Sequence, residues 1–193
     1  IGLLIIEANC VRKFKMIKLS ELNVKWIRKE GNWSQRDPNI SGIETNSSKI
    51  KRGEIFFALK GISSHGADFA DDAIKRGASL IITDYDGSQI IKRNTNEFQI
   101  PVLICENTSE ILTKMCFKFF PSLPSNLMAV TGTNGKTSVV NFIQQLLELN
   151  DLSCVTVGTL GVKGVMNIST NTTTPTQVEL YKILKNAREL GTD

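Results

Sequence analysis

The segment from residue 54 to residue 120 alternates apolar runs with amphipathic stretches, and this pattern restricts the fold more than any other feature of the chain. The apolar runs are "EIFFALKG" (54–61), "SLIITD" (79–84) and "PVLICE" (101–106). Residues 69–78 and 108–120 have helical spacing, with Gly77 ending the first helix and Thr108 as the N-cap of the second. Apolar strands that alternate with helices are typical of a mostly parallel sheet covered by helices, so we predict an α/β fold.

The regions on either side have a different character. Residues 19–29 are weakly helical, and residues 31–46 are rich in turn formers. "PSLPSN" (121–126) interrupts the alternation with two prolines and two serines, so we place a domain boundary there. We expect a mixed α/β domain over residues 16–122 and the truncated start of a second, mostly parallel-sheet domain over residues 127–193.

The expected second domain opens as strand, loop, helix and strand. "LMAV" (127–130) and "SCVTVGT" (153–159) are predicted strands. "SVVNFIQQLLEL" (138–149) and residues 175–190 are predicted helices. Because most of its sheet is missing, we expect residues 127–193 to be less stable than residues 16–120.

Composition and charge favour a globular cytoplasmic protein. The 193 residues are 41% hydrophobic and 22% charged, and the net charge of +4 comes largely from the first thirty residues, which we interpret as a solvated face. The opening "IGLLII" is too short to span a membrane. Because Met16 opens an amphipathic stretch, we expect residues 1–15 not to belong to the functional protein.

The four cysteines are far apart and form no C-x-x-C pair. They are Cys10, Cys105, Cys116 and Cys154, and we interpret them as buried free thiols in a reducing cytosol rather than a disulfide or metal site. The single histidine, His65, is interpreted as a surface loop residue because no nucleophile or carboxylate pattern surrounds it. Trp26 and Trp33 are interpreted as packing groups.

The stretch "VTGTNGKTS" (130–138) is a glycine turn between a predicted strand and a predicted helix. Such a turn points successive backbone N–H groups at one spot, where the helix dipole adds partial positive charge. Gly132 and Gly135 let the backbone approach phosphate oxygens, Lys136 can reach the β and γ phosphates, and the Thr137 hydroxyl suits Mg²⁺. The turn departs from G-x-x-x-x-G-K-[ST] because Val130 stands at the first glycine position, so a helix-capping turn without a ligand is the alternative.

"VTGTNGKTS" resembles the ATP-binding loop of the Mur ligase superfamily, the ATP-dependent amide-forming enzymes of peptidoglycan precursor synthesis and folate polyglutamylation. "SSKIKRGEIFFALKG" (47–61) is similar to the first-domain signature of the members that bind UDP-muramoyl peptides. "GTLG" (158–161) and "TTP" (173–175) resemble the MurE type, which adds the third residue. The resemblance extends from about Met16 to the end of the chain, as in an N-terminal fragment.

The resemblance implies a nucleotide site in the second domain. ATP phosphorylates a substrate carboxylate in these ligases, and an incoming amine attacks the acyl phosphate. The residues that would hold the triphosphate are Gly132, Thr133, Asn134, Gly135, Lys136, Thr137 and Ser138. Lys136 would be catalytic, because it neutralises charge that moves during transfer, and Thr137 would contact Mg²⁺.

The resemblance also implies contacts with the muramoyl nucleotide. The corresponding residues are Thr45, Ser47, Ile62, Ser63 and Ser64 at the nucleotide, and Thr172, Thr173 and Thr174 near the substrate phosphates. The family usually has Asp-Ser-Arg where this chain has Asn46-Ser47-Ser48, and a polar loop without substrate contacts is the alternative reading. Thr174, followed by Pro175 and by Gln177 at the third position, also fits a capping box.

The expected function is therefore ATP-dependent and Mg²⁺-dependent addition of an amino acid, with meso-diaminopimelate favoured, to UDP-N-acetylmuramoyl-L-alanyl-D-glutamate. The expected partners are that muramoyl peptide and the amino acid, without nucleic acid or membrane, and the expected state is a monomer. Because the selecting C-terminal domain and a carbamylated lysine would lie beyond residue 193, we expect the chain alone to be inactive. A MurF-type ligase, a folylpolyglutamate synthetase and a non-catalytic nucleotide-binding module are the alternatives, although the first-domain signature disfavours the folate enzyme.

Overall fold

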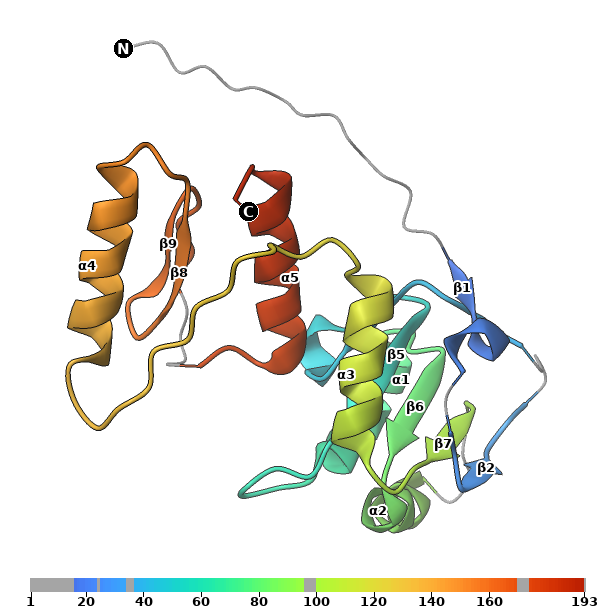
Figure 1. The fold of residues 1–193 in the computed structure, drawn as a ribbon. Coiled ribbons are helices and arrows are strands. Elements are labelled where there is room, and N and C mark those ends of the chain that lie inside the picture. Colours follow the sequence, from blue (N-terminus) through green and yellow to red (C-terminus); the bar gives the residue numbers. More distant parts are fainter. Residues whose placement is uncertain (1–15, 24, 34–36, 96–99, 170–173, 193) are drawn as a thin grey trace.

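A five-stranded sheet between two groups of helices forms the larger part of the molecule (Figure 1). The computed structural model describes residues 16–23, 25–33, 37–95, 100–169 and 174–192. The strand order is β2-β7-β6-β5-β4, with the bounds β2 Arg28–Glu30, β4 Gly42–Glu44, β5 Glu54–Ala58, β6 Leu80–Thr83 and β7 Val102–Ile104. The four strands β4 to β7 pair in parallel and β2 pairs antiparallel to β7, which confirms the predicted α/β fold with a mainly parallel sheet.

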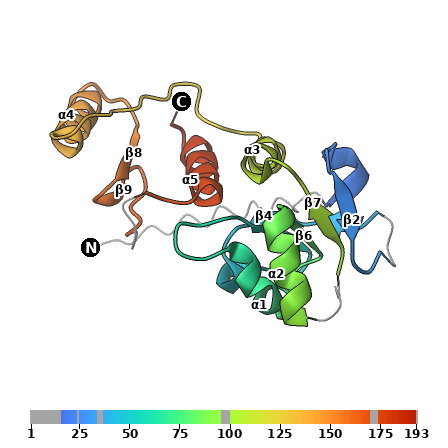
Figure 2. The same ribbon diagram turned by 90° about the horizontal axis from the view of Figure 1, so that it is seen from below.

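Both faces of this sheet are buried, so its strands carry apolar residues on both sides. Along β5, Ile55 and Phe57 join one core cluster, whereas Phe56 and Ala58 join the other, as the two-residue period of a strand requires. The first cluster lies under α3 (Thr108–Phe119) and α5 (Gln177–Glu189), and the second lies under α1 (Ala70–Lys75) and α2 (Tyr85–Thr95). Figure 2 shows the two groups of helices on opposite sides of the sheet.

The part of the chain after α3 forms a smaller unit, from which α5 departs. This unit contains α4 (Lys136–Glu148) and an antiparallel hairpin of β8 (Val155–Gly158) and β9 (Gly161–Gly164). No residue of α4 is buried. Helix α5 follows the hairpin in sequence but packs on the first unit, where Val178 is 0% exposed within the first core cluster and Tyr181 lies edge-on to Phe117.

Several predicted elements near the N-terminus are corrected by the structure. Residues 19–29 contain a short 3₁₀ helix, η1 (Leu19–Leu22), and then the start of β2, because pairing with β7 overrides weak local helix propensity. The turn-rich residues 31–46 supply the strands β3 (Asn39–Ile40), which pairs with β1 (Ile17–Lys18), and β4. Trp26 and Trp33 pack against the first core cluster, as predicted.

The later helices agree with the sequence pattern, with shifted boundaries. The helix predicted over residues 69–78 begins as a 3₁₀ turn, η3 (Gly66–Phe69), continues as α1 and stops before Gly77, whose φ is 94°. Asn107, rather than Thr108, caps α3, because its Oδ1 accepts the Glu110 N–H at 3.0 Å. Helix α2 was not predicted.

The strand predicted at residues 127–130 was wrong. The structure assigns no strand to this stretch, and Leu127 and Met128 are 60% and 72% exposed. A strand forms only where a neighbour can pair with its backbone groups, and within the described residues none lies beside this stretch. The strand predicted over residues 153–159 is confirmed as β8, and the helix predicted over residues 138–149 is confirmed as α4.

Candidate functional site

The loop before α4 has the open geometry that the glycine pattern predicts. Gly132 and Gly135 have φ angles of 149° and 77°, in the region that side chains with a Cβ rarely adopt. A Cβ built on Gly135 would meet no atom within 4 Å, so the surface of the loop at this position is open.

Backbone donors of the first helical turn line this open surface. The first intrahelical hydrogen bond joins the Val139 N–H to the Gly135 carbonyl at 3.0 Å. The N–H groups of Lys136, Thr137 and Ser138 therefore precede the first bond and have no acceptor within the helix. All three residues are exposed, so these donors and the positive end of the helix dipole face solvent.

The side chains of this loop are held close to it. The Lys136 Nζ donates to the Gly132 carbonyl at 2.5 Å and to the Thr133 carbonyl at 3.3 Å. The Thr137 Oγ1 lies 3.1 Å from the Thr159 Oγ1, in the turn between β8 and β9. This contact connects the stretches "GTNGKT" and "GTLG" through two threonines that are 22 positions apart in the sequence. Thr159 was not singled out from the sequence, although it lies within the second of these stretches.

The loop after β4 contains the first group of predicted substrate residues. Its 3₁₀ turn, η2 (Ser47–Lys49), is capped by Asn46, whose Oδ1 accepts the Ser48 N–H at 3.0 Å and the Ser48 hydroxyl at 2.8 Å. Ser47 is buried, and its hydroxyl, together with the Arg76 guanidinium, holds the pKa of the Asp72 carboxyl below its ordinary value. The Thr45 Oγ1 is also buried, and it has no hydrogen-bond partner within the described part of the chain.

Glu44, at the end of β4, organises this loop and was missed from the sequence. It is 2% exposed, and both of its carboxylate oxygens accept hydrogen bonds. The Oε1 accepts the Thr45 N–H at 2.9 Å and the Asn46 N–H at 3.4 Å. The Oε2 accepts a hydrogen bond from the Lys182 Nζ of α5 at 2.7 Å. The sequence pattern gives no signal for this pairing because its partners lie 138 residues apart.

The second group of predicted substrate residues forms an exposed turn after β5. The Gly61 N–H donates to the Ser64 carbonyl at 3.0 Å, and Ile62, Ser63 and Ser64 are all exposed. Because β4 and β5 are parallel neighbours, this turn and the Thr45–Ser47 loop start from the same edge of the sheet. Ligands of open α/β sheets bind outside the carboxyl ends of the strands, which is this edge.

His65 is not a surface loop residue, so that interpretation was wrong. It is 8% exposed and caps η3, because its Nδ1 accepts the Ala67 N–H at 3.0 Å. With Nδ1 accepting, the ring proton lies on Nε2, which is 3.1 Å from the Asp84 Oδ1. A Cβ on Gly87 would lie 2.5 Å from the His65 Cε1, so the histidine is enclosed by the start of α2.

The start of α5 is the third predicted substrate segment. Thr172 and Thr173 lie outside the described residues, whereas Thr174 is described. The predicted capping box of Thr174 and Gln177 is wrong, because α5 begins at Gln177 and its N-cap is Thr176. The Thr176 Oγ1 accepts the Glu179 N–H at 3.3 Å, and the Glu179 Oε2 accepts the Thr176 N–H at 2.8 Å.

An ion pair attaches the start of α5 to the loop after β4. The Lys49 Nζ lies 2.5 Å from the Glu179 Oε1, and this hydrogen bond lowers the pKa of Glu179 and raises the pKa of Lys49. The Gln177 side chain donates to the Thr113 Oγ1 of α3 at 2.6 Å. The structure therefore brings two of the three predicted substrate segments together. Within the described ranges, no hydrogen bond or ion pair connects residues 132–138 with Thr45, Ser47 or the 62–64 turn.

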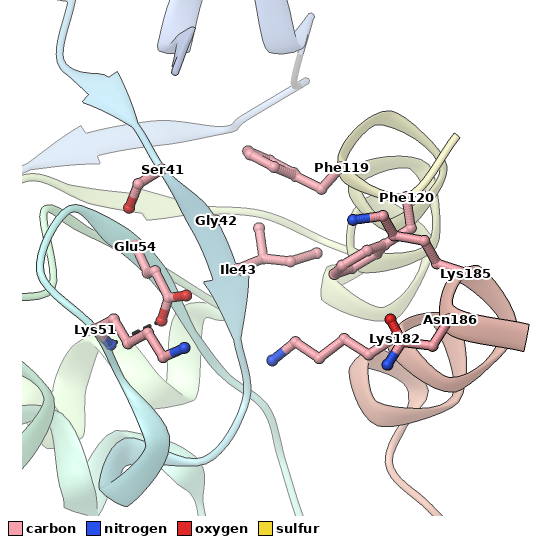
Figure 3. Close-up of a pocket in the computed structure, with 10 residues that line it drawn as sticks. All are labelled: Ser41, Gly42, Ile43, Lys51, Glu54, Phe119, Phe120, Lys182, Lys185 and Asn186. Atoms are coloured by element: carbon pink, nitrogen blue, oxygen red, sulfur yellow. Dashed lines mark hydrogen bonds between the residues drawn. The ribbon is translucent and has the colours of Figure 1, made fainter. Parts of the chain in front are cut away.

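A pocket of about 260 Å³ lies at the opposite end of β4, between that strand, the end of α3 and the outer half of α5 (Figure 3). Its lining residues are Ser41, Gly42, Ile43, Lys51, Glu54, Phe119, Phe120, Lys182, Lys185 and Asn186. Burial raises the pKa of the Glu54 carboxyl, against the opposing effects of the Lys51 N–H and the Lys182 ammonium. The pocket adjoins the amino ends of β4 and β5, away from the predicted substrate loops.

Other chemistry is limited in the described part of the chain. No group of three or more His, Cys, Asp or Glu residues there is arranged to hold a metal ion. Cys105 and Cys116 are buried free thiols, as predicted, and burial raises their pKa values to about 11 and about 12. Cys154 is partly buried, and Cys10 lies outside the described residues. None of the described helices is both long and apolar enough to cross a bilayer.

Family models match two parts of the chain. The model for the Mur ligase family, catalytic domain, matches residues 39–116, and the Mur ligase middle domain matches residues 130–193. These ranges include both the strand-end loops and the glycine loop.

Curated ligases resemble the chain in sequence, and a solved structure resembles it in fold. The chain is 42% identical over 106 residues to a UDP-N-acetylmuramoyl-L-alanyl-D-glutamate--2,6-diaminopimelate ligase of Rickettsia typhi, covering 55% of this chain and 20% of that protein. It is 33% identical over 155 residues to the enzyme of the same name from Aquifex aeolicus, covering 79% of this chain and 30% of that protein. A solved structure of a ligase of this name matches 92% of this chain and 34% of its own, with a TM-score of 0.66 and 22% identity, which supports the fold. The chain thus spans between a fifth and a third of these relatives.

Proposed function

The chain belongs to the Mur ligase family, and on this premise we propose that it contributes the muramoyl-nucleotide loops and the ATP loop of a ligase that adds meso-diaminopimelate to UDP-N-acetylmuramoyl-L-alanyl-D-glutamate. Such a ligase forms an amide bond in peptidoglycan synthesis. The observation that carries the proposal is the exposed start of α4, where positive-φ glycines, free helical N–H groups and one ammonium converge in a sequence that matches the family's middle domain.

The residues of this loop fit a nucleotide triphosphate. The open space beside Gly135 leaves room for phosphate oxygens, and the N–H groups of Lys136, Thr137 and Ser138 are directed outward to receive them. We propose that Gly132–Ser138 hold the triphosphate and that the Lys136 ammonium, now on the Gly132 carbonyl, moves to the phosphates. The Thr137 hydroxyl is the proposed Mg²⁺ contact, and it would leave Thr159 to take that role.

ATP, when bound, supplies the phosphate that converts a substrate carboxylate into an electrophile. The chain's own contribution is to orient and to neutralise: the first turn of α4 fixes the phosphates, and Lys136 offsets charge that develops between them. The loops after β4 and β5 are proposed to hold the uridine end of the substrate through Thr45, Ser47 and the 62–64 turn. The Thr45 hydroxyl has no hydrogen-bond partner within the described residues, and we propose that a change in the loop on binding exposes it to the ligand.

The domain division belongs to the same proposal. We assign residues 16–122 to substrate binding and residues 127–193 to the start of the ATP-binding domain, with α5 docking back on the first. Thr172, Thr173 and Thr174 are proposed to contact the muramoyl substrate. The proposed compartment is the cytoplasm and the proposed state a monomer.

Calorimetric titration of the chain with UDP-N-acetylmuramoyl-L-alanyl-D-glutamate and, separately, with ATP and Mg²⁺ tests the proposal. We expect the muramoyl peptide to bind, and we expect Lys136→Met to weaken ATP binding at least about tenfold, because it removes a charge-assisted phosphate contact. Lys163→Met, which changes an exposed lysine of β9, is the matched control and should leave both affinities unchanged. Binding of ATP alone would favour a non-catalytic nucleotide module, and binding of neither ligand would refute the proposal.

A further inference from the structure

Helix α5 and the loop after β4 are connected through one buried carboxylate. Glu44 is 2% exposed, whereas the Lys182 side chain that contacts it is 42% exposed, so the helix brings its ammonium to a charge that the first unit has buried. A buried carboxylate is stable only when it is paired and fully hydrogen-bonded. Glu44 meets this condition with two backbone donors from its own loop and one ammonium from α5.

The two oxygens of Glu44 divide these contacts between two segments. The Oε1 receives the N–H groups of Thr45 and Asn46, which fixes the backbone of the proposed substrate loop. The Oε2 receives the Lys182 ammonium. The loop and α5 therefore share one carboxylate as their hydrogen-bond partner.

The contact of Lys182 with Glu44 connects the outer half of α5 to β4. Near its start, α5 is attached by the buried Val178 and by the ion pair between Lys49 and Glu179. Beyond Val178, the pocket separates the helix from β4, and Figure 3 shows the Lys182 side chain extending from α5 toward the strand. Tyr181 packs this half of the helix against Phe117 and Phe120 at the end of α3. Across the pocket, the ion pair between Lys182 and Glu44 joins the helix to β4.

We propose that Glu44 is a positioning residue that couples the Thr45–Ser47 substrate loop to the docking of α5 through Lys182. The proposal rests on the proposed function, because it assigns the coupling to a loop that holds the muramoyl nucleotide. Glu44 does not touch the substrate. It orders the backbone of the Thr45–Ser47 loop, which is proposed to touch the substrate. This ordering requires that α5, the helix after the proposed Thr172–Thr174 contacts, is docked.

The first measurement is amide hydrogen exchange of the chain without ligand, followed by NMR. In Lys182→Met, the buried carboxylate loses its cation and is expected to leave the loop for solvent. The Thr45 N–H should then exchange about tenfold faster, the effect expected for the loss of one hydrogen bond to a charged group. Lys182→Arg should restore slow exchange because it keeps the charge. Lys185→Met, one turn further along α5, is the control and should leave exchange at Thr45 unchanged.

The second measurement is the affinity for UDP-N-acetylmuramoyl-L-alanyl-D-glutamate in a double-mutant cycle. Glu44→Gln and Lys182→Met should each weaken binding about fivefold, and the double variant should be no weaker than the single ones, because both changes break one unit. If the double variant loses affinity by the product of the two single losses, the residues act independently and the coupling is overturned. Unchanged affinity in both single variants, or unchanged amide exchange at Thr45 in Lys182→Met, would overturn it as well. If the wild-type chain binds no muramoyl peptide, the proposed function fails, and the exchange measurement still decides whether Lys182 orders the loop.

Discussion

Replacing Val178 with alanine tests whether α5 is part of the first core rather than a neighbour of it. Val178 is 0% exposed within the cluster that also includes residues of β5, β6 and α3. Removing its two methyl groups lowers the free energy of unfolding by about 1.6 kcal/mol, at about 0.8 kcal/mol per buried carbon. The cavity that remains adds to this loss. The higher helix propensity of alanine raises the free energy of unfolding by about 0.5 kcal/mol and offsets part of this loss. The net expectation is a loss of about 1 to 2 kcal/mol.

Tryptophan fluorescence during urea unfolding measures this effect, because Trp26 and Trp33 pack against the same cluster and report on the first unit. Val139→Ala on α4 is the matched control: it makes the same chemical change in a helix at a residue that is 44% exposed. We expect the control to shift the midpoint little or slightly upward. Coincident midpoints for the two variants would refute the reasoning, since they would mean that α5 adds nothing to the stability that the tryptophans report.

Three further predictions concern single side chains. Lys136→Ala should abolish ATP turnover in a ligase that contains this chain while leaving its unfolding midpoint unchanged, since Lys136 is exposed; unchanged turnover would exclude its assigned role. Burial raises the pKa of Glu54, so the carboxyl favours the folded state below its unfolded pKa and loses that contribution as pH rises through the folded pKa. Glu54→Gln should therefore gain stability relative to wild type between pH 4 and pH 7 in urea titrations, and a constant difference would contradict the assigned cause. Gly87→Ala should destabilise the chain by about 1 to 3 kcal/mol in thermal unfolding, because its Cβ would lie 2.0 Å from the Thr83 Oγ1. Gly158→Ala, where a Cβ meets nothing within 4 Å, should leave the stability nearly unchanged. If both alanine variants change the stability equally, the chain relieves the contact between the new Cβ and Thr83, and the prediction is wrong.

The parallel sheet could be predicted because its signal is local. Strands β5, β6 and β7 are buried on both faces, so each is a continuous apolar run that stands out from the helices beside it. Helix α2 gives no such signal, because its sequence "YDGSQIIKRNT" is largely polar. Ile91 is the residue of this helix that is buried in the second core cluster. Strand β2 was missed for a related reason, since its residues "RKE" are partly exposed and gain their strand geometry from β7.

The candidate site could be predicted only where its chemistry lies within one loop. The glycine loop carries its positive-φ glycines, its lysine and its helix start within a few residues, and the structure has this geometry. The cap of α5 was misassigned because both Thr174 with Gln177 and Thr176 with Glu179 fit the capping pattern. A carboxylate is the stronger acceptor, and Glu179 also reaches Lys49, a contact that the local pattern does not contain.

Glu44 illustrates the limit of local reasoning. An acidic residue at the end of an apolar strand looks like a solvated loop residue, but the structure buries it and supplies a cation from a distant helix. Pairings of this kind depend on tertiary docking and therefore leave no period or spacing in the sequence.

The contact between Glu44 and Lys182 closes a loop of 138 residues, and this separation dictates an order of events during biosynthesis. The ribosome releases β4 to β7 well before α5, so the sheet can assemble while its buried carboxylate still lacks a cation. Closing so long a loop is entropically slow, and α5 is expected to dock last. Until then the newly made sheet carries an apolar patch, which Val178 later covers, beside a carboxylate that lacks its cation.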